Sequence, residues 1–141
     1  MRHEIVHDLI DAGAVAVLRM DEADPLLRTV EALRTGGITA IEITMTTPNA
    51  LTAIEQAATA TANAPGVHIG VGSVLDGPTT QQALLAGAEF VVSPVLKPEI
   101  IETSHRYDAP AIPGAFTPSE VSRAHEMGAD IVKIFPASRL G

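Results

Sequence analysis

Two charged residues stand in the middle of short apolar runs, where charged side chains are unusual. Lys133 is the central residue of "IVKIF" and Glu42 is the central residue of "AIEIT". Lys97 is the only other lysine of the chain, so Lys133 is not one member of a lysine-rich surface. Both runs have the length and composition of buried strands. Because side chains alternate along a strand, we expect each charged group to point away from its apolar neighbours.

This pair of residue types indicates a particular chemistry. Apolar surroundings disfavour an ammonium ion, so they lower the pKa of a lysine and make its free amine available as a nucleophile. Such an amine forms a Schiff base with a carbonyl substrate, and a nearby carboxylate can carry the protons that the later steps require. The pattern therefore predicts Lys133 as nucleophile and Glu42 as general acid and base. A buried ion pair retained only for packing is the alternative.

The elements that must position these residues form a repeat. Val- and Ile-rich runs are separated by segments with helical spacing, and three of those segments end in glycine shortly before the next run. Such repeated βα units predict a parallel sheet with helical crossovers. We expect helix caps at Asp24, Thr47 and Thr117, the last with Glu120 in a capping box. The six predicted strands are "AVAVLR" (14–19), "AIEITM" (40–45), "HIGVGSV" (68–74), "FVVSPV" (90–95), "AIPGAF" (111–116) and "IVKIFP" (131–136).

The predicted fold class is α/β, and the polar residues within the strands decide between two architectures. A doubly wound sheet packs both faces of its central strands against helices and leaves no shared interior for groups such as Glu42, Ser73 and Lys133. A (β/α)8 barrel has such an interior, which opens at the carboxyl ends of the strands. We therefore expect residues 1–141 to form a single partial TIM-barrel domain, with a helix at residues 2–12 closing its bottom.

Composition excludes several other classes. The net charge of −8 argues against nucleic acid or an anionic membrane as partner. No cysteine is present, and His3 and His7 have metal-compatible spacing without a third ligand, so we expect no metal and no cofactor. The amino terminus does not resemble a signal peptide, and we expect a cytoplasmic location. "GVGSV" lacks a dinucleotide fingerprint, so its glycines are expected to let the backbone approach a small substrate.

Several motifs together resemble one enzyme family. "AIEITMTTPNAL", "GVGSVL", "FVVSP", "PGAFTPSE" and "VKIFPAS" are similar, in order and spacing, to the 2-keto-3-deoxy-6-phosphogluconate (KDPG) and 4-hydroxy-2-oxoglutarate aldolases. The resemblance implies that Lys133 forms the Schiff base with pyruvate and that Glu42 is the proton shuttle. It also implies substrate-binding positions, which are Arg19, Thr46, Ser73, Pro94 and Phe135. Thr46 stands where many KDPG aldolases have an arginine, so Arg19 would supply the cation for the substrate carboxylate.

The resemblance implies a class I aldolase that cleaves 2-dehydro-3-deoxy-6-phosphogluconate to pyruvate and glyceraldehyde 3-phosphate, as in the Entner-Doudoroff pathway. Aldolases for 4-hydroxy-2-oxoglutarate or for 2-dehydro-3-deoxy-6-phosphogalactonate are alternatives. A Schiff-base dehydratase and a non-catalytic barrel that binds keto acids or phosphate are further alternatives. The expected partner is a small keto-acid sugar phosphate, and the family resemblance implies a homotrimer.

The predicted strand count is short of a closed barrel. A TIM barrel has eight strands, and the spacing along these 141 residues leaves room for six. Family members continue for about 60 further residues, with two strands whose loops bind phosphate. We therefore expect an open, curved sheet of six parallel strands, with two unpaired edges and with Lys133 and Glu42 on its concave side. We also expect little or no aldolase turnover from these 141 residues alone.

Overall fold

The computed structural model of the protein describes residues 1–20 and 25–139. Strands and helices alternate along these residues, as predicted. The strands are β1 (Val15–Leu18), β2 (Ala40–Thr44), β3 (His68–Gly72), β4 (Phe90–Val92), β5 (Ala111–Ile112), β6 (Gly114–Ala115) and β7 (Lys133–Ile134). The helices are α1 (Arg2–Ala12), α2 (Leu26–Thr35), α3 (Ala50–Thr61), α4 (Gly77–Leu85), α5 (Pro98–Arg106) and α6 (Pro118–Glu126), followed by a 3₁₀ turn at Ala137–Arg139.

All strand pairs are parallel, and spatial order follows chain order from β1 to β5. β6 pairs with β7 in a separate two-stranded ladder. The predicted fifth strand is therefore two short strands separated by Pro113, which corrects the expectation of one continuous strand. Proline has no backbone N–H, so it cannot donate to the ladder at this position. The Pro113 carbonyl still accepts a hydrogen bond of 3.0 Å from the Lys133 N–H, which connects the two ladders.

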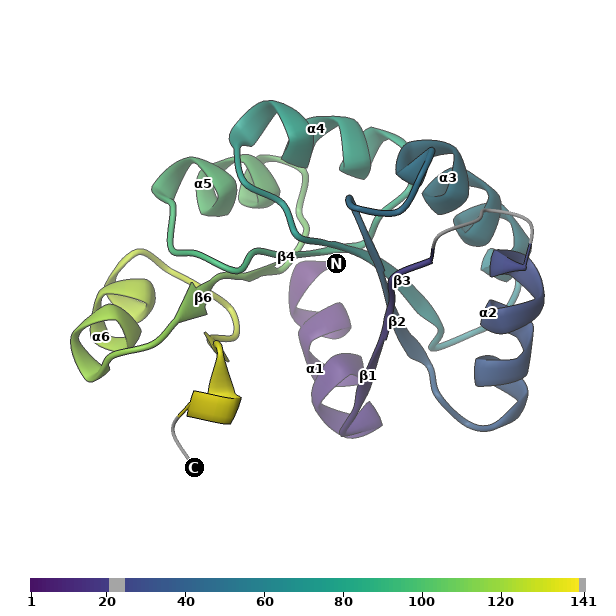
Figure 1. The fold of residues 1–141 in the computed structure, drawn as a ribbon, viewed down its shortest axis with the longest axis horizontal. Helices are drawn as coiled ribbons and strands as arrows, with labels where there is room; N and C mark the ends of the chain where they lie inside the picture. Colours follow the sequence, from purple (N-terminus) through teal and green to yellow (C-terminus); the bar gives the residue numbers. More distant parts are fainter. Residues whose placement is uncertain (21–24, 140–141) are drawn as a thin grey trace.

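Helices α2 to α5 form an outer layer over the convex side of the curved sheet (Figure 1). The outward-facing residues of β2 and β3, such as Ile41, Ile43 and Ile69, are fully buried. They belong to one cluster with helix residues that include Val30 and Ile54. This burial explains the Ile- and Val-rich strands, because burying each such side chain contributes about 1.5–3 kcal/mol.

Helix α1 covers the opposite, inner side of the sheet. Leu9 of α1 belongs to a second buried cluster with inward-facing strand residues, namely Ala40, Phe90, Val92 and Ile112. The helix predicted at residues 2–12 is thus confirmed, and Gly13 ends it in a left-handed conformation with φ of 66°. Among the described residues, none of the helices has both the length and the apolar composition that a membrane crossing requires.

The predicted helix caps have different outcomes. Thr117 accepts a hydrogen bond from the Glu120 N–H in a complete capping box at α6, as predicted. Thr47 does not cap α3, because that helix begins at Ala50 after Asn49. The Thr47 hydroxyl instead lies near Thr44 and the Met20 N–H. Asp24 lies outside the described residues.

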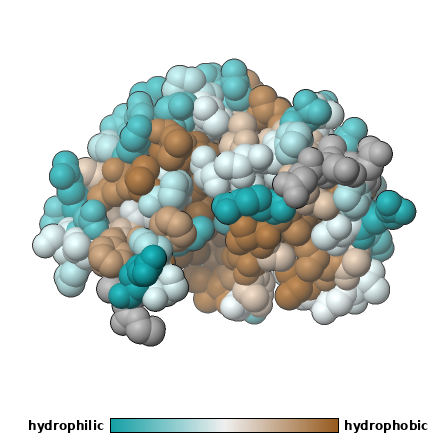
Figure 2. Space-filling view, in the orientation of Figure 1, coloured by the Kyte–Doolittle hydropathy of each residue, from teal (hydrophilic) through white to brown (hydrophobic). Residues whose placement is uncertain are grey.

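The sheet is open rather than closed within the described residues. β1 is an edge of the five-stranded ladder and β7 is an edge of the two-stranded ladder, and each exposes apolar side chains. Val15 and Val17 of β1 are 38% and 50% exposed, and Ile134 of β7 is 43% exposed. Hydrophobic surface accordingly gathers around the β1 region (Figure 2). The architecture is therefore a parallel α/β sheet curved as part of a barrel, as expected for fewer than eight strands.

Candidate active site

Glu42 and Lys133 line one cavity, although they come from strands that are not neighbours in the sheet. Their strands lie in separate ladders, β2 and β7, and the curvature of the sheet brings both to its inner side. The cavity has a volume of about 490 Å³ and a mostly apolar lining. Besides the two charged residues, its lining consists of Leu9, Ile10, Gly13, Ala14, Val15, Val17, Val92, Ile112 and Ile131.

Glu42 is the buried carboxylate of this cavity. It is only 3% exposed, and burial raises its pKa above the ordinary value of 4.5. The positive charges of Lys133 and Arg19 act in the opposite sense and lower that pKa. Burial has the larger effect. A carboxyl group in such surroundings exchanges protons nearer to neutral pH than a solvated glutamate does.

Lys133 is partly buried and is the first residue of β7. Its Nζ lies 5.4 Å from the centroid of the Phe135 ring, within the range of a cation–π contact. Its backbone N–H donates to the Pro113 carbonyl, which fixes the strand that carries it. The amine therefore has an aromatic neighbour directly after its strand and lines the same cavity as Glu42.

The other predicted substrate-binding residues follow the carboxyl ends of their strands. Arg19 comes directly after β1, Ser73 directly after β3, and Pro94 two residues after β4. Since all these strands are parallel, their carboxyl ends lie at the same edge of the sheet. The lining of the 490 Å³ cavity does not include these three residues, Thr46 or Phe135. Of the predicted catalytic and substrate-binding residues, only Glu42 and Lys133 line this cavity.

A cluster of threonines follows Glu42 along the chain. The Thr44 hydroxyl lies 2.9 Å from the Thr46 hydroxyl and 3.4 Å from that of Thr47. Thr44 and Thr47 are buried, whereas Thr46 is exposed. The Thr46 hydroxyl therefore lies at the surface end of a hydroxyl network that begins two residues after Glu42.

Ser73 has a backbone conformation that non-glycine residues rarely adopt. Its φ of 59° lies in the left-handed region. The chain turns at this point from β3 into the loop before α4. Such strain is concentrated at functional sites, so Ser73 stays a predicted residue of the substrate site.

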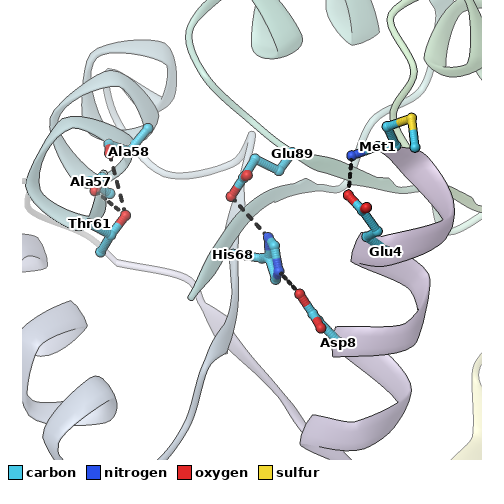
Figure 3. Close-up of polar contacts among 8 residues, drawn as sticks. All are labelled: Met1, Glu4, Asp8, Ala57, Ala58, Thr61, His68 and Glu89. Atoms are coloured by element: carbon cyan, nitrogen blue, oxygen red, sulfur yellow. Dashed lines mark hydrogen bonds and ion pairs between the residues drawn. The ribbon is translucent and has the colours of Figure 1, made fainter. Parts of the chain in front are cut away.

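One polar cluster had no counterpart in the sequence-based prediction. The ring of His68 lies between two carboxylates, with Nε2 2.8 Å from Asp8 of α1 and Nδ1 3.2 Å from Glu89 (Figure 3). His68 begins β3 and Glu89 directly precedes β4, so this cluster lies at the amino ends of the strands, away from the candidate site. It connects α1 to the sheet. No sequence motif indicates it, because the three residues meet only through the fold.

The protein is therefore of the β/α-barrel type, with a strand-borne lysine and a buried glutamate that line one cavity. Comparison with known proteins specifies the family. Residues 5–141 match the family described as KDPG and KHG aldolase, and the chain belongs to it. A 2-dehydro-3-deoxy-phosphogluconate aldolase of Treponema pallidum is 41% identical over 127 residues, which are 90% of this chain and 58% of that relative.

Solved structures agree with this assignment. The 2-keto-3-deoxy-6-phosphogluconate aldolase of Zymomonas mobilis ZM4, solved with 3-phosphoglycerate, matches with a TM-score of 0.86 and 31% identity, over 100% of this chain and 66% of that one. The KDPG aldolase of Legionella pneumophila, with pyruvate captured as a covalent carbinolamine, matches with a TM-score of 0.79 and 32% identity, over 90% and 60%. The chain thus spans 57–64% of the length of the first four curated relatives that it matches.

Proposed function

We propose that this chain is the lysine-bearing part of a class I aldolase that cleaves 2-dehydro-3-deoxy-6-phosphogluconate to pyruvate and glyceraldehyde 3-phosphate. One observation carries the proposal: Lys133 and the buried Glu42 line the same apolar cavity. The carbinolamine captured in the Legionella relative supports covalent attachment of pyruvate in this family. Residues 1–141 would form one partial barrel domain of a cytoplasmic homotrimer.

In the proposed mechanism, the Lys133 amine attacks the C2 carbonyl of the keto acid and forms a carbinolamine, which loses water to give an iminium ion. Glu42, as carboxylate, accepts the proton of the C4 hydroxyl while the C3–C4 bond breaks. The bonding electrons move into the iminium and form an enamine, and the aldehyde leaves. Protonated Glu42 then returns the proton to C3, and water releases pyruvate from Lys133.

The carboxyl edge of the sheet would bind the rest of the substrate. Arg19 would attract the substrate carboxylate, while Ser73, Pro94 and Phe135 would contact the substrate outside the 490 Å³ cavity. Thr46 offers a hydroxyl group and no charge, so Arg19 is the cation that we assign to the carboxylate. Two other substrates for the same type of cleavage are alternatives, 4-hydroxy-2-oxoglutarate and 2-dehydro-3-deoxy-6-phosphogalactonate.

Product analysis of the whole protein tests this function. Incubation with each of the three keto acids should release pyruvate together with the matching aldehyde, in equal amounts, from one of them. Release of water with no carbon–carbon cleavage would indicate a dehydratase instead. Binding of a keto acid without formation of a product from any of the three would indicate a non-catalytic barrel. Lys133→Ala should abolish turnover, whereas Lys97→Ala should leave it unchanged because exposed Lys97 donates to the Leu75 carbonyl outside the cavity.

A further inference from the structure

Two glycines occupy the inner face of β3. In "HIGVG", Ile69 and Val71 are fully buried in the outer cluster beneath the helices. Because side chains alternate along a strand, Gly70 and Gly72 face the inner side, toward α1 and the cavity. The central strand of the inner face therefore carries no side chains at these two positions.

Side chains of the neighbouring strands occupy the space that the glycines leave. A Cβ atom on Gly70 would overlap the ring of Phe90, which comes from β4. A Cβ atom on Gly72 would overlap Oε1 and Cδ of Glu42 and would lie 2.7 Å from its Cγ. The Glu42 carboxyl group thus lies against the bare backbone of Gly72.

The strand register shows which way Glu42 leans. Glu42 pairs with Gly70, and Thr44 pairs with Gly72. The Glu42 carboxyl group nevertheless lies over Gly72, two residues closer to the carboxyl end of β3. The ring of Phe90 already occupies the space over Gly70, directly beside Glu42. Glu42 therefore leans diagonally toward the edge of the sheet at which Arg19 and Ser73 follow their strands.

Backbone conformation does not explain the glycine at position 72. The glycines with positive φ among the described residues are Gly13, Gly37, Gly66, Gly87 and Gly128, and Gly72 is not one of them. Glycine within a regular strand weakens the strand, since it has no side chain to pack and loses more conformational entropy. Its presence here is explained by the close approach of the Glu42 carboxyl group.

We propose that Gly72 is a positioning residue, whose missing side chain gives Glu42 the slot that directs its carboxyl group toward the substrate bound to Lys133. The inference rests on the aldolase function proposed above. It predicts that an added methyl group at position 72 affects proton transfer by Glu42 and not the formation of the Schiff base. The two steps are measurable separately, because pyruvate alone forms the imine and then exchanges its methyl protons with solvent deuterium through the enamine.

The test compares Gly72→Ala with the parent protein in two assays. Borohydride trapping of pyruvate measures the imine, and NMR in deuterated water measures exchange at the pyruvate methyl group. Gly72→Ala should retain the trapped imine and lose roughly tenfold or more in exchange rate. Gly36→Ala adds the same methyl group at an exposed helix end with φ of −77°, so it should change neither result. An exchange rate within about twofold of the parent would overturn the inference.

A second variant separates displacement of Glu42 from general damage to the fold. Asp is one methylene shorter than Glu, so Glu42→Asp in the Gly72→Ala background should restore exchange to about the rate of Glu42→Asp alone. If Gly72→Ala does not fold, the double variant Gly72→Ala/Glu42→Asp tests the inference instead. A double variant that folds and has the exchange rate of Glu42→Asp supports the inference, whereas a double variant that does not fold overturns it.

Failure of the proposed function would be recognised independently. A parent protein that traps no pyruvate would contradict the aldolase mechanism. The effect of Gly72 on the position of Glu42 could still be tested by NMR titration of the Glu42 carboxyl carbon. Gly72→Ala should displace that carboxyl group toward water and lower the pKa of Glu42 toward its ordinary value. An unchanged Glu42 pKa in a folded Gly72→Ala protein would overturn the positioning role.

Discussion

Glu42 and Lys133 line a single cavity although β2 and β7 belong to separate ladders. Only the curvature of the sheet makes this possible, because in a flat sheet their strands would be several neighbours apart. Burial raises the Glu42 pKa while the charge of Lys133 opposes that shift. This relationship between a carboxyl group of raised pKa and an amine is the basis of the proposed chemistry.

Glu42→Gln should separate the two chemical steps. The amide has nearly the same shape but cannot accept or release the proton, so we expect pyruvate exchange and aldol cleavage to fall by about 10²-fold or more. The Schiff base on Lys133 should still form. NMR measures the exchange rate and borohydride trapping measures the Schiff base. A Glu42→Gln protein with the parent's exchange rate would contradict the role of Glu42.

Arg19→Gln should change the pH dependence of exchange. Arg19 favours the ionised form of Glu42, so its removal should raise the Glu42 pKa further. The exchange rate depends on Glu42 as carboxylate, so the acidic limb of its pH profile should move to higher pH. Exposed Arg19 is screened by solvent, so we expect the shift to be small. A shift to lower pH would contradict the assignment.

Loss of the same cation should also weaken substrate binding. If Arg19 binds the substrate carboxylate, KM for the keto acid should rise roughly tenfold or more in Arg19→Gln. Exposed Arg28 on α2 offers a control, since Arg28→Gln should leave KM unchanged. Equal KM values for Arg19→Gln and the parent protein would remove Arg19 from the proposed site.

His68 should make stability depend on pH. Its hydrogen bond to Glu89 raises the His68 pKa above 6.5, burial opposes this, and the bond to Asp8 adds to the increase. The folded state therefore holds the proton more tightly than the unfolded state. This stabilisation is complete below pH 6.5 and is lost as the pH rises through the folded-state pKa. Glu89 also raises the pKa of the Met1 amine, which donates a hydrogen bond to Glu4.

His68→Gln should therefore cost more stability in acid than in base. The loss should be about 1 kcal/mol at about pH 5.5 and smaller at about pH 8.5, as measured by urea unfolding at both values. His125→Gln, at an exposed position on α6, provides the control and should show no such difference. An equal cost at both pH values would show that His68 acts through packing alone.

Asp130 should be important for stability, because it connects β5 to α5 and α1. Its Oδ2 accepts hydrogen bonds of 2.9 Å from the Ala111 N–H and from the His105 ring, and its Oδ1 lies 3.3 Å from Arg2 of α1. Asp130→Ala would leave the buried Ala111 N–H without this partner, so we expect a loss of about 1–3 kcal/mol in unfolding free energy. Exposed Asp11→Ala should cost far less, and similar losses for both variants would contradict this explanation.

Sequence patterns could predict the features that depend on local periodicity. Alternation in "AIEIT" and "IVKIF" predicted which side chains face inward, because a strand has a strict period of two. The ladder break at Pro113 was missed, although proline's lack of an N–H was an available signal. The Thr47 cap was wrong because its hydroxyl instead joins Thr44, a contact that depends on how the loop after β2 closes.

Features that depend on strand register were beyond the sequence. The glycines of "GVGSV" were expected to admit a substrate, but Gly70 and Gly72 instead accommodate Phe90 and Glu42. That difference follows from pairing between strands that are 20 or more residues apart. The contacts of His68 with Asp8 and Glu89 depend on the same register and on the placement of α1.

Borohydride trapping with pyruvate shows whether Lys133 is the nucleophile. The protein is incubated with pyruvate, reduced, and digested, and the modified peptide is identified by mass spectrometry. The account predicts one stable adduct on Lys133, which persists in Lys97→Ala and disappears in Lys133→Ala. No adduct on the folded protein, or an adduct on Lys97 or the amino terminus in place of Lys133, would contradict it.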